Sequence, residues 1–264
     1  MKEMIEQPNN VAIEEAEVFQ APKAEFIEKI KDPEYLPTRQ DLYDAFADNE
    51  NKLKDWTYFC DRNDVDHPIY EFINEGFVKA LSDYILERTK SFTKKGVDKV
   101  TILELGAGDG RLTHFLKERL NEESIGMIDV VATDTGSWKI KQEFPVENIT
   151  NEEALKKYKP QIVISSWMPP RVDFTAAIRA CPSVDEYLLI GEAYGATGEP
   201  WLTWGQHGME QEDIDEPPVF EKENFYPKEI ESISKEQLCK LDEPSLDSSE
   251  GFSVSSTISF KRKK

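Results

Sequence analysis

The sequence contains few of the residues that build metal centres and disulfide frameworks. Its 264 residues include only three cysteines and three histidines. Cys60, Cys181 and Cys239 are scattered without the C-x-x-C spacing of zinc sites, and they do not form a disulfide framework. The histidines also lie far apart along the chain. We therefore expect no metal site and a reducing compartment.

Long apolar runs and positive charge are also scarce. No run approaches the roughly 18 to 20 apolar residues of a membrane span, and the acidic first 20 residues lack the apolar core of a signal peptide. The 32 Lys and Arg residues against 52 Asp and Glu residues give a formal charge of −20. Such a surface repels phosphate backbones and anionic lipids. We expect a cytoplasmic protein with no nucleic-acid or membrane partner and with a cationic or neutral substrate, either a small molecule or a protein.

The most informative stretch runs from residue 100 to residue 138. Val100–Leu105 is an apolar run rich in β-branched residues, which predicts a buried parallel strand. It leads into a glycine turn at residues 106–110, and the next apolar residues follow the spacing of an amphipathic helix over 112–120. Ile128–Ala132 is a second apolar strand, followed closely by Asp134. Together these features predict a nucleotide-binding βαβ unit.

The spacing of the glycines indicates which kind of nucleotide binds. A dinucleotide fingerprint needs a third glycine three residues after the second, but that position holds Arg111 and the third glycine comes early, at Gly110. Glu104, before the first glycine, would repel a phosphate and suit an amino group. The pattern E-x-G-x-G-x-G, with an acid after the next strand, resembles the S-adenosylmethionine (SAM) site of class I methyltransferases.

This resemblance implies a cofactor and a set of contacts. SAM would lie with its amino-acid end beside the glycine turn, and Asp134 would accept hydrogen bonds from both ribose hydroxyls. The end of the third strand would meet adenine, through Glu147 or Asn148. The cofactor-binding residues implied in this way are Glu104, Gly106, Ala107, Gly108, Gly110, Asp134, Thr135, Asn148 and Ser165.

The resemblance extends over roughly residues 69–260. It implies an α/β fold with a Rossmann-like, seven-stranded, mostly parallel sheet, helices on both faces and an antiparallel final strand. The last strand is expected to have one wet face, because apolar residues there alternate with serines and Thr257. Further strands are expected at 144–149, 160–166, 186–191 and 252–260, with helices at 69–86, 151–158 and 174–180.

Three segments follow from this pattern. Residues 1–40 are polar, acidic and rich in proline, and we expect them to be partly disordered, with a helical turn or two at 24–30. Residues 41–96 should form a helical N-terminal extension, in which Pro68 begins the 69–86 helix and Asp66 caps it. Residues 97–264 should form the SAM-binding core. The core includes an acidic insertion at about 206–250 with one modest element at 228–241.

The acceptor should lie beyond the carboxyl ends of the strands. Trp167 begins the loop after the fourth strand, where methyltransferases acting on amino groups carry an Asn/Asp/Ser-Pro-Pro-aromatic motif. Here Met168 and Arg171 flank the two prolines, so an amine nitrogen is only one of the acceptors that the motif allows. Glu192 and Tyr194 follow the fifth strand and complete the predicted catalytic group, with Tyr58 as a further positioning residue.

Two tryptophans close to that strand have two interpretations. Trp201 and Trp204 are three residues apart, and as exposed indoles they would cage a cation. Packing in the core is the alternative, and it is the commoner fate of tryptophan.

Two other functions remain open besides a methyltransferase. A nicotinamide-dependent oxidoreductase is disfavoured by Arg111 and Glu104. A methyltransferase-like module that acts through its acidic segments as an interaction protein is compatible with the same sequence.

Overall fold

The computed structural model describes residues 20–50, 52–62, 68–124, 126–206, 216–242 and 254–263. Its centre is a seven-stranded sheet in the order β3-β2-β1-β4-β5-β7-β6. The first five strands are parallel, and β7 pairs antiparallel to both β5 and β6. The predicted Rossmann-like fold is therefore confirmed. The strands are β1 (Val100–Leu105), β2 (Ile128–Asp134), β3 (Glu147–Asn148), β4 (Ile162–Ser166), β5 (Glu186–Gly191), β6 (Phe225–Glu229) and β7 (Ser256–Arg262).

Helices cover both faces of the sheet because the central strands are apolar on both sides. On one face α4 and α5 pack against β1, β2, β4 and β5 in a continuous core. On the other face a second core joins α6, α7 and α8 to the same sheet. The helices of the core region are α4 (Glu75–Thr93), α5 (Arg111–Ser124), α6 (Asn151–Tyr158), α7 (Thr175–Ala180), α8 (Val219–Lys222) and α9 (Glu231–Ser234), with a short π-helix at Pro200–Trp204.

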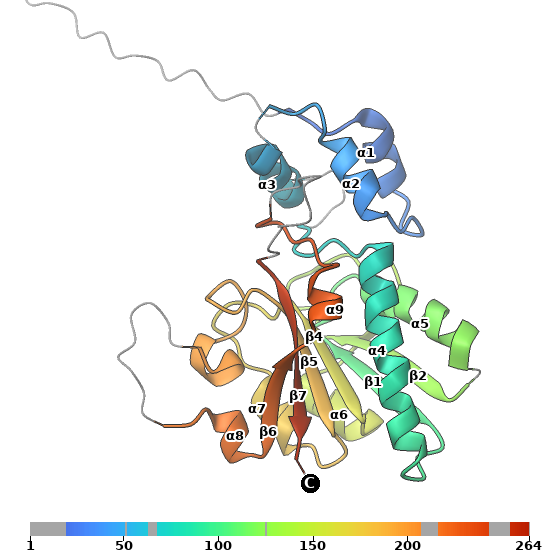
Figure 1. The fold of residues 1–264 in the computed structure, drawn as a ribbon, viewed down its shortest axis with the longest axis vertical. Coiled ribbons are helices and arrows are strands. Elements are labelled where there is room, and N and C mark those ends of the chain that lie inside the picture. Colours follow the sequence, from blue (N-terminus) through green and yellow to red (C-terminus); the bar gives the residue numbers. More distant parts are fainter. Residues whose placement is uncertain are drawn as a thin grey trace, which may run out of the picture.

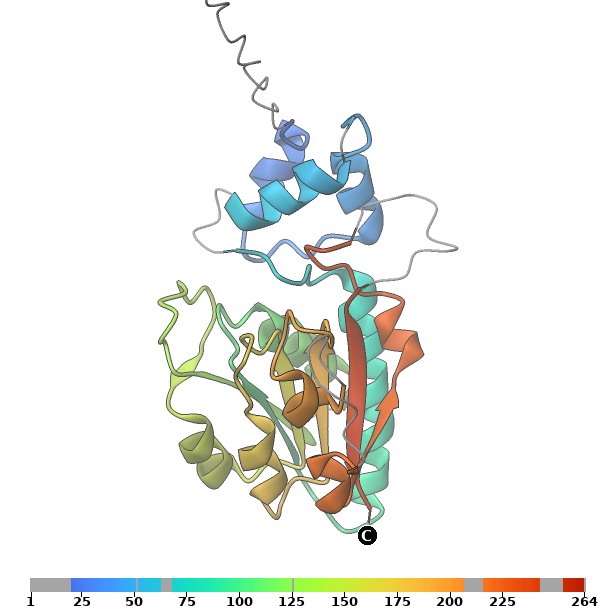
Figure 2. The ribbon, with the colours of Figure 1, turned by 90° about the vertical axis from the view of Figure 1, so that its left-hand side faces the viewer.

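A third, smaller core belongs to the N-terminal helices α1 (Ala24–Ile30), α2 (Arg39–Ala45) and α3 (Lys52–Arg62). These helices pack around buried aromatic residues, among them Phe46 and Trp56, whose rings meet edge to face 5.3 Å apart. Figures 1 and 2 show α1–α3 grouped beyond one end of the sheet. We call this group the N-terminal layer.

The predicted boundaries at residues 40 and 96 stay predictions. Within the first segment, residues 20–40 contain α1 and the start of α2, and Phe26 and Ile30 are buried. Residues 1–19 lie outside the described part of the chain.

The predicted 69–86 helix begins later than expected. Asn74 caps α4 by accepting a hydrogen bond from Phe77 N, so the helix starts at Glu75. The preceding residues are extended instead, because Phe72 N donates to Leu238 O and Glu71 forms a bridge with Cys239. Asp66, the expected cap, lies outside the described residues. The apolar spacing of this stretch fitted a helix, but partners far along the chain hold it extended.

Three other expectations are corrected. The third strand comprises only Glu147–Asn148 rather than residues 144–149. The acidic stretch 206–250 contains an edge strand, β6, in which only Phe225 is buried, so its sequence signal is weak. The expected wet face of β7 is buried as well, because β7 lies between two strands and under α9.

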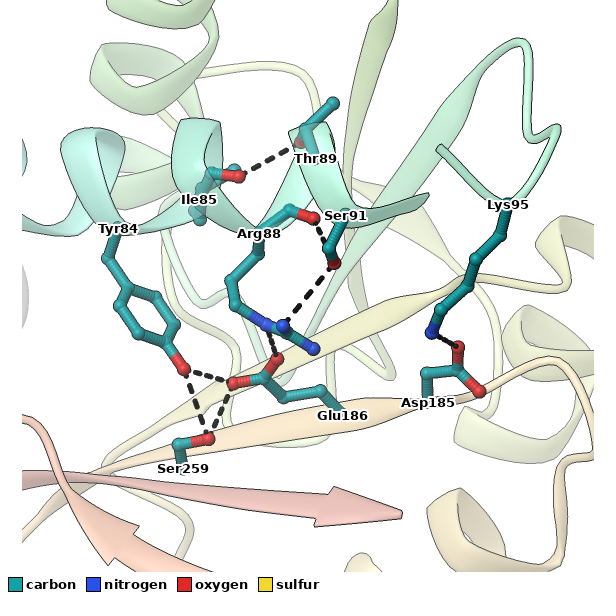
Figure 3. Close-up of polar contacts among 9 residues, drawn as sticks. All are labelled: Tyr84, Ile85, Arg88, Thr89, Ser91, Lys95, Asp185, Glu186 and Ser259. Carbon is teal, nitrogen blue, oxygen red and sulfur yellow. Dashed lines mark hydrogen bonds and ion pairs between the residues drawn. The ribbon is translucent and has the colours of Figure 1, made fainter. Parts of the chain in front are cut away.

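The sheet and α4 are joined by a buried ionic network (Figure 3). Glu186, at the start of β5, is fully buried and accepts hydrogen bonds from the Tyr84 hydroxyl, Arg88 Nε and Ser259 Oγ. Helix α4, β5 and β7 therefore share one carboxylate at the end of the sheet away from the N-terminal layer.

Among the helices that the structure describes, none has the length and apolar character that a membrane span requires.

Removing this carboxylate should destabilise the whole domain. We expect Glu186→Ala to lower the free energy of unfolding by about 3–5 kcal/mol, because it leaves Arg88 partly buried without its partner. Tyr84→Phe removes a single hydroxyl and should cost about 1 kcal/mol. Urea unfolding followed by circular dichroism measures both. A smaller loss for Glu186→Ala than for Tyr84→Phe would contradict the role given to the network.

Candidate active site

A cavity of about 340 Å³ opens at the carboxyl ends of the parallel strands. The turn after β1, the loop after β2 and the loop after β4 form its walls. The N-terminal layer and the extended residues 68–73 close it from the other side, through residues that include Ile30, Pro37 and Phe72. Its volume lies at the lower end of the range of small-molecule sites.

The glycine turn brings the backbone of residues 106–108 to the cavity wall. Gly106, Gly108 and Gly110 all have positive φ, at +71°, +56° and +84°, and side chains disfavour this conformation. A Cβ on Gly110 would lie 2.7 Å from Val146 Cγ2, so this position needs glycine for space as well. Gly106, Ala107 and Gly108 line the cavity, whereas Gly110 belongs to the turn but does not line the cavity.

Asp134 stands opposite the turn, at the end of β2. Its Oδ2 accepts a hydrogen bond from Gly108 N at 3.0 Å, and its Oδ1 accepts from Gly136 N at 2.7 Å. These bonds hold the carboxylate at the cavity wall, next to Thr135. Trp138 and Ile140 continue the same wall, although the sequence analysis did not select them. In the sequence, the only indication of this part of the wall is the aromatic Trp138 shortly after Asp134.

Glu104 lies at the floor of the cavity and is 3% exposed. Burial raises its pKa to about 7; a hydrogen bond from Thr113 Oγ1 (2.6 Å) opposes the shift, while the nearby Asp109 and Asp134 add to it. The carboxyl group therefore lies among other acids, and a cationic ligand group would favour its charged form.

Besides Gly110, two of the predicted cofactor contacts, Asn148 and Ser165, lie outside the cavity lining. Asn148 is exposed and accepts a hydrogen bond from Gln142 Nε2 at 2.8 Å. Ser165 is buried, and no partner for its hydroxyl is found among the described residues. Its neighbour Ser166 lines the cavity instead. Glu147, the alternative for adenine, is paired with Lys157 at 2.6 Å.

Trp167 does face the cavity. Its backbone is in the left-handed region, with φ of 51°, and its indole stacks on Tyr70 at 5.6 Å with an interplanar angle of 27°. The indole Nε1 donates to Glu71 Oε2 at 2.9 Å. Sequence reasoning missed Glu71, because its partners are distant along the chain and no local motif marks it.

The other predicted acceptor-side residues lie outside the lining. Glu192 is buried and accepts from the backbone N–H groups of Tyr194 and Ala196, at 2.6 and 2.7 Å, so its carboxylate holds the turn after β5. Tyr194 is 71% exposed and Tyr58 is 39% exposed. Their contact with a substrate stays a prediction.

The expected pair of exposed indoles is not formed. Trp204 is 4% exposed, packs in the second core and donates from Nε1 to Thr197 O at 2.9 Å. Trp201, in the same π-helix, is half-buried and does not line the cavity. The packing interpretation is therefore the right one for Trp204.

A histidine does meet two carboxylates, outside the cavity. Nε2 of His114 lies 3.0 Å from Glu34 and 3.7 Å from Glu118, and the ring stacks on Phe144 at 3.8 Å. The histidines lie far apart along the chain, and no local pattern in the sequence marks the approach of His114 to these two acids. Both carboxylates are exposed, and the contact links the N-terminal segment to α5.

No protein-family model and no curated protein matches the chain. Among solved structures it is similar to the DszA carbon methyltransferase, with 15% identity, a TM-score of 0.42 and coverage of 70% of this chain and 53% of that one. It is also similar to the citrinin polyketide synthase CMeT domain, with 13% identity, a TM-score of 0.40 and coverage of 72% and 53%. The chain thus spans about half the length of these two.

A third similar structure is magnesium protoporphyrin IX methyltransferase (ChlM) from Synechocystis PCC 6803 with bound SAM. The identity is 12%, the TM-score 0.34 and the coverage 87% of this chain and 99% of that one. At such identities the likeness concerns the fold alone. Any function must therefore come from this chain's own residues.

The buried Glu104 makes stability depend on pH. Its folded pKa of about 7 lies above the ordinary value of 4.5, so between these values the folded protein keeps a proton that the unfolded chain releases. Stability should fall as pH rises through this window, by up to about 3 kcal/mol from this group at about 1.4 kcal/mol per pKa unit.

Glu104→Gln should remove this loss. We expect the variant to be more stable than the parent at pH 8, by up to about 3 kcal/mol, and nearly equal to it at pH 4. Urea unfolding at both pH values measures the difference, with Glu122→Gln on the exposed side of α5 as the control. An equal effect of Glu104→Gln at both pH values would contradict the raised pKa.

Proposed function

We propose that this protein is a SAM-dependent methyltransferase. The observation that carries the proposal is the joint position of Glu104, the glycine turn and Asp134 on one cavity at the carboxyl ends of β1 and β2. In open α/β sheets this edge is where ligands bind. The fold alone does not imply this activity. The proposal therefore depends on whether the residues that line the cavity fit the cofactor.

The residues fit SAM at three points. Glu104 offers a buried carboxylate to the α-ammonium group, and the charged groups that act on it, Asp109 and Asp134, are acids. Gly106 lets a ligand approach the backbone, whereas a Cβ there would lie 3.3 Å from Phe174. Asp134 has two carboxylate oxygens at the cavity wall, each of which can accept a further hydrogen bond from a ribose hydroxyl.

The same residues do not favour a dinucleotide. A pyrophosphate would meet Glu104 and Asp109 beside the glycine turn. Arg111 is the only guanidinium that the described residues bring to the lining, and it is paired with Asp109 at 3.5 Å. It lies at the position where a dinucleotide fingerprint has its third glycine.

When SAM is bound, its sulfonium supplies a methyl group for in-line transfer to an acceptor nucleophile. The protein's task is then to hold two reactants in line and to exclude water. The N-terminal layer and residues 68–73 close the cavity, and the loop that begins at Trp167 forms the wall beyond the glycine turn. A base is needed only if the acceptor atom is protonated.

The acceptor is proposed to be cationic or neutral, and small or presented as a single side chain. The small cavity and its lining carboxyl groups support this choice. The absence of nucleic-acid and membrane partners and a cytoplasmic location are further parts of the proposal, and they rest on the charge of −20.

Calorimetry with S-adenosylhomocysteine, the demethylated product, tests the proposal, with NAD as the competing ligand. We expect binding of the former and none of NAD. Asp134→Asn should weaken binding by about 1.5–3 kcal/mol, roughly 10- to 150-fold, because a charged acceptor for the ribose is lost.

Asp129→Asn is the matched control. Asp129 lies on the same strand, pairs with Lys99 at 3.3 Å and does not line the cavity. Its substitution should leave affinity unchanged. NAD binding in place of S-adenosylhomocysteine would favour an oxidoreductase, and binding of neither ligand would favour a non-catalytic module.

A further inference from the structure

The half of the cavity away from the glycine turn has a distinct chemistry. It is lined by residues 68–73 and by the loop after β4, and most of these side chains are apolar or aromatic. Among the described residues that line this half, Glu71 is the only carboxylic acid, and none is a lysine, arginine or histidine. An anionic group here would meet a buried acid and none of the bases that the described lining could offer.

Glu71 is held by donors on several elements. Its Oε2 accepts from Trp167 Nε1 at 2.9 Å, from Ser255 Oγ at 2.8 Å and from Gln237 Nε2 at 3.5 Å. Its Oε1 accepts from Leu238 N at 3.0 Å. Each carboxylate oxygen offers about two acceptor positions, so Oε1, which accepts one of these bonds, has one position left.

The charge on Glu71 is incompletely balanced. The side chain is 8% exposed, and burial raises its pKa to about 7 although three side chains donate to it. Asp242 is the charged neighbour that acts on it, and it raises the pKa further. A positively charged ligand would supply a counter-charge that none of the described groups acting on Glu71 provides.

The aromatic rings beside Glu71 also suit a cation. Tyr70 and Trp167 stack on each other at the cavity wall, and an ammonium group is attracted to such faces. Lys240 Nζ already lies 4.9 Å from the centre of the Tyr70 ring. Trp167 is fixed by its backbone N–H, which donates to Ile190 O at 2.8 Å, and by its bond to Glu71.

We propose that Tyr70, Glu71 and Trp167 form the acceptor subsite, and that the acceptor is a protonated amine carried by a small apolar group. The ammonium group binds Glu71 Oε1 and the indole face, and the apolar part lies against the prolines and Val172 of the loop after β4. This assignment rests on the proposed function, because only a methyltransferase has an acceptor.

Binding of three small probes to protein saturated with S-adenosylhomocysteine tests the subsite. Benzylamine, benzyl alcohol and benzoate share one ring and carry a positive, a neutral and a negative group. Ligand-observed NMR titration at pH 8, where Glu71 is mostly ionised, should rank benzylamine at least tenfold above benzyl alcohol. Benzoate should bind more weakly than either. Equal binding of benzylamine and benzyl alcohol, or tighter binding of benzoate, would overturn the proposal.

Glu71→Gln keeps the shape of the side chain and removes its charge. It should lower benzylamine affinity at least tenfold and change benzyl alcohol affinity less than threefold. Glu75→Gln is the matched control, since it makes the same charge change four residues away on an exposed side chain that does not line the cavity. An equal loss in both variants would show a general field effect and overturn the subsite.

The test of the acceptor subsite and the test of the proposed function have distinguishable outcomes. Loss of S-adenosylhomocysteine binding by the parent protein would refute the methyltransferase assignment before any probe is added. Intact cofactor binding without a preference for the amine would refute the subsite alone. If Glu71→Gln does not fold, the ranking of the three probes on the parent protein still decides the question.

Discussion

The reversal of strand order at β1 is the constraint from which the site follows. Strand β1 pairs with β2 on one side and with β4 on the other, so the chain winds outward in two directions from it. Helix α5 after β1 packs on one face of the sheet, and α7 after β4 packs on the other. The loops that leave these two strands therefore diverge, and a crevice opens between them. The glycine turn and Trp167 lie on its two sides because each follows directly from its own strand.

A crevice of this kind becomes a cavity only when something covers it. Here the cover is the extended segment 68–73 and the N-terminal layer above it. Glu71 joins the segment through hydrogen bonds to Trp167 in the loop after β4 and to Leu238 and Ser255 far along the chain. One carboxylate thus links three distant parts of the sequence at the wall of the site. Because buried charges are costly unless they are well hydrogen-bonded, these contacts also depend on one another.

Local features were readable from the sequence wherever the chain itself determines them. Residues close together in the chain determine the strand Val100–Leu105, its glycine turn and the amphipathic α5. The fold could be predicted because the prediction used these local features. The same holds for the positions of Glu104 and Asp134 at the ends of neighbouring strands. Parallel strands bring their carboxyl ends to one edge whatever the rest of the molecule does.

Features set by distant partners were not readable. The apolar spacing of residues 69–73 is compatible with a helix, and only the pairing with residues 238–239 shows that the segment is extended. The serine-rich face of β7 looked solvent-exposed, yet Thr257 bonds to Gln237 and Ser259 to the buried Glu186. For Trp204 the sequence was compatible with both an exposed indole and core packing, and the fold places it in the core. In each case the deciding contact spans a separation that no local pattern reports.

The effect of a negative charge on ligand binding depends on whether that charge lies at the surface or in the cavity. The overall charge of −20 lies mostly on side chains in water, where ions screen it within about 8–10 Å at physiological salt. Such a field can attract a cation toward the molecule, but it discriminates weakly between ligands that have already arrived. Glu104 and Glu71 act where water is largely excluded, and there an unbalanced charge is costly until a ligand offsets it. We therefore expect these two carboxyl groups, rather than the acids on the surface, to select a cationic ligand group at either end of the cavity.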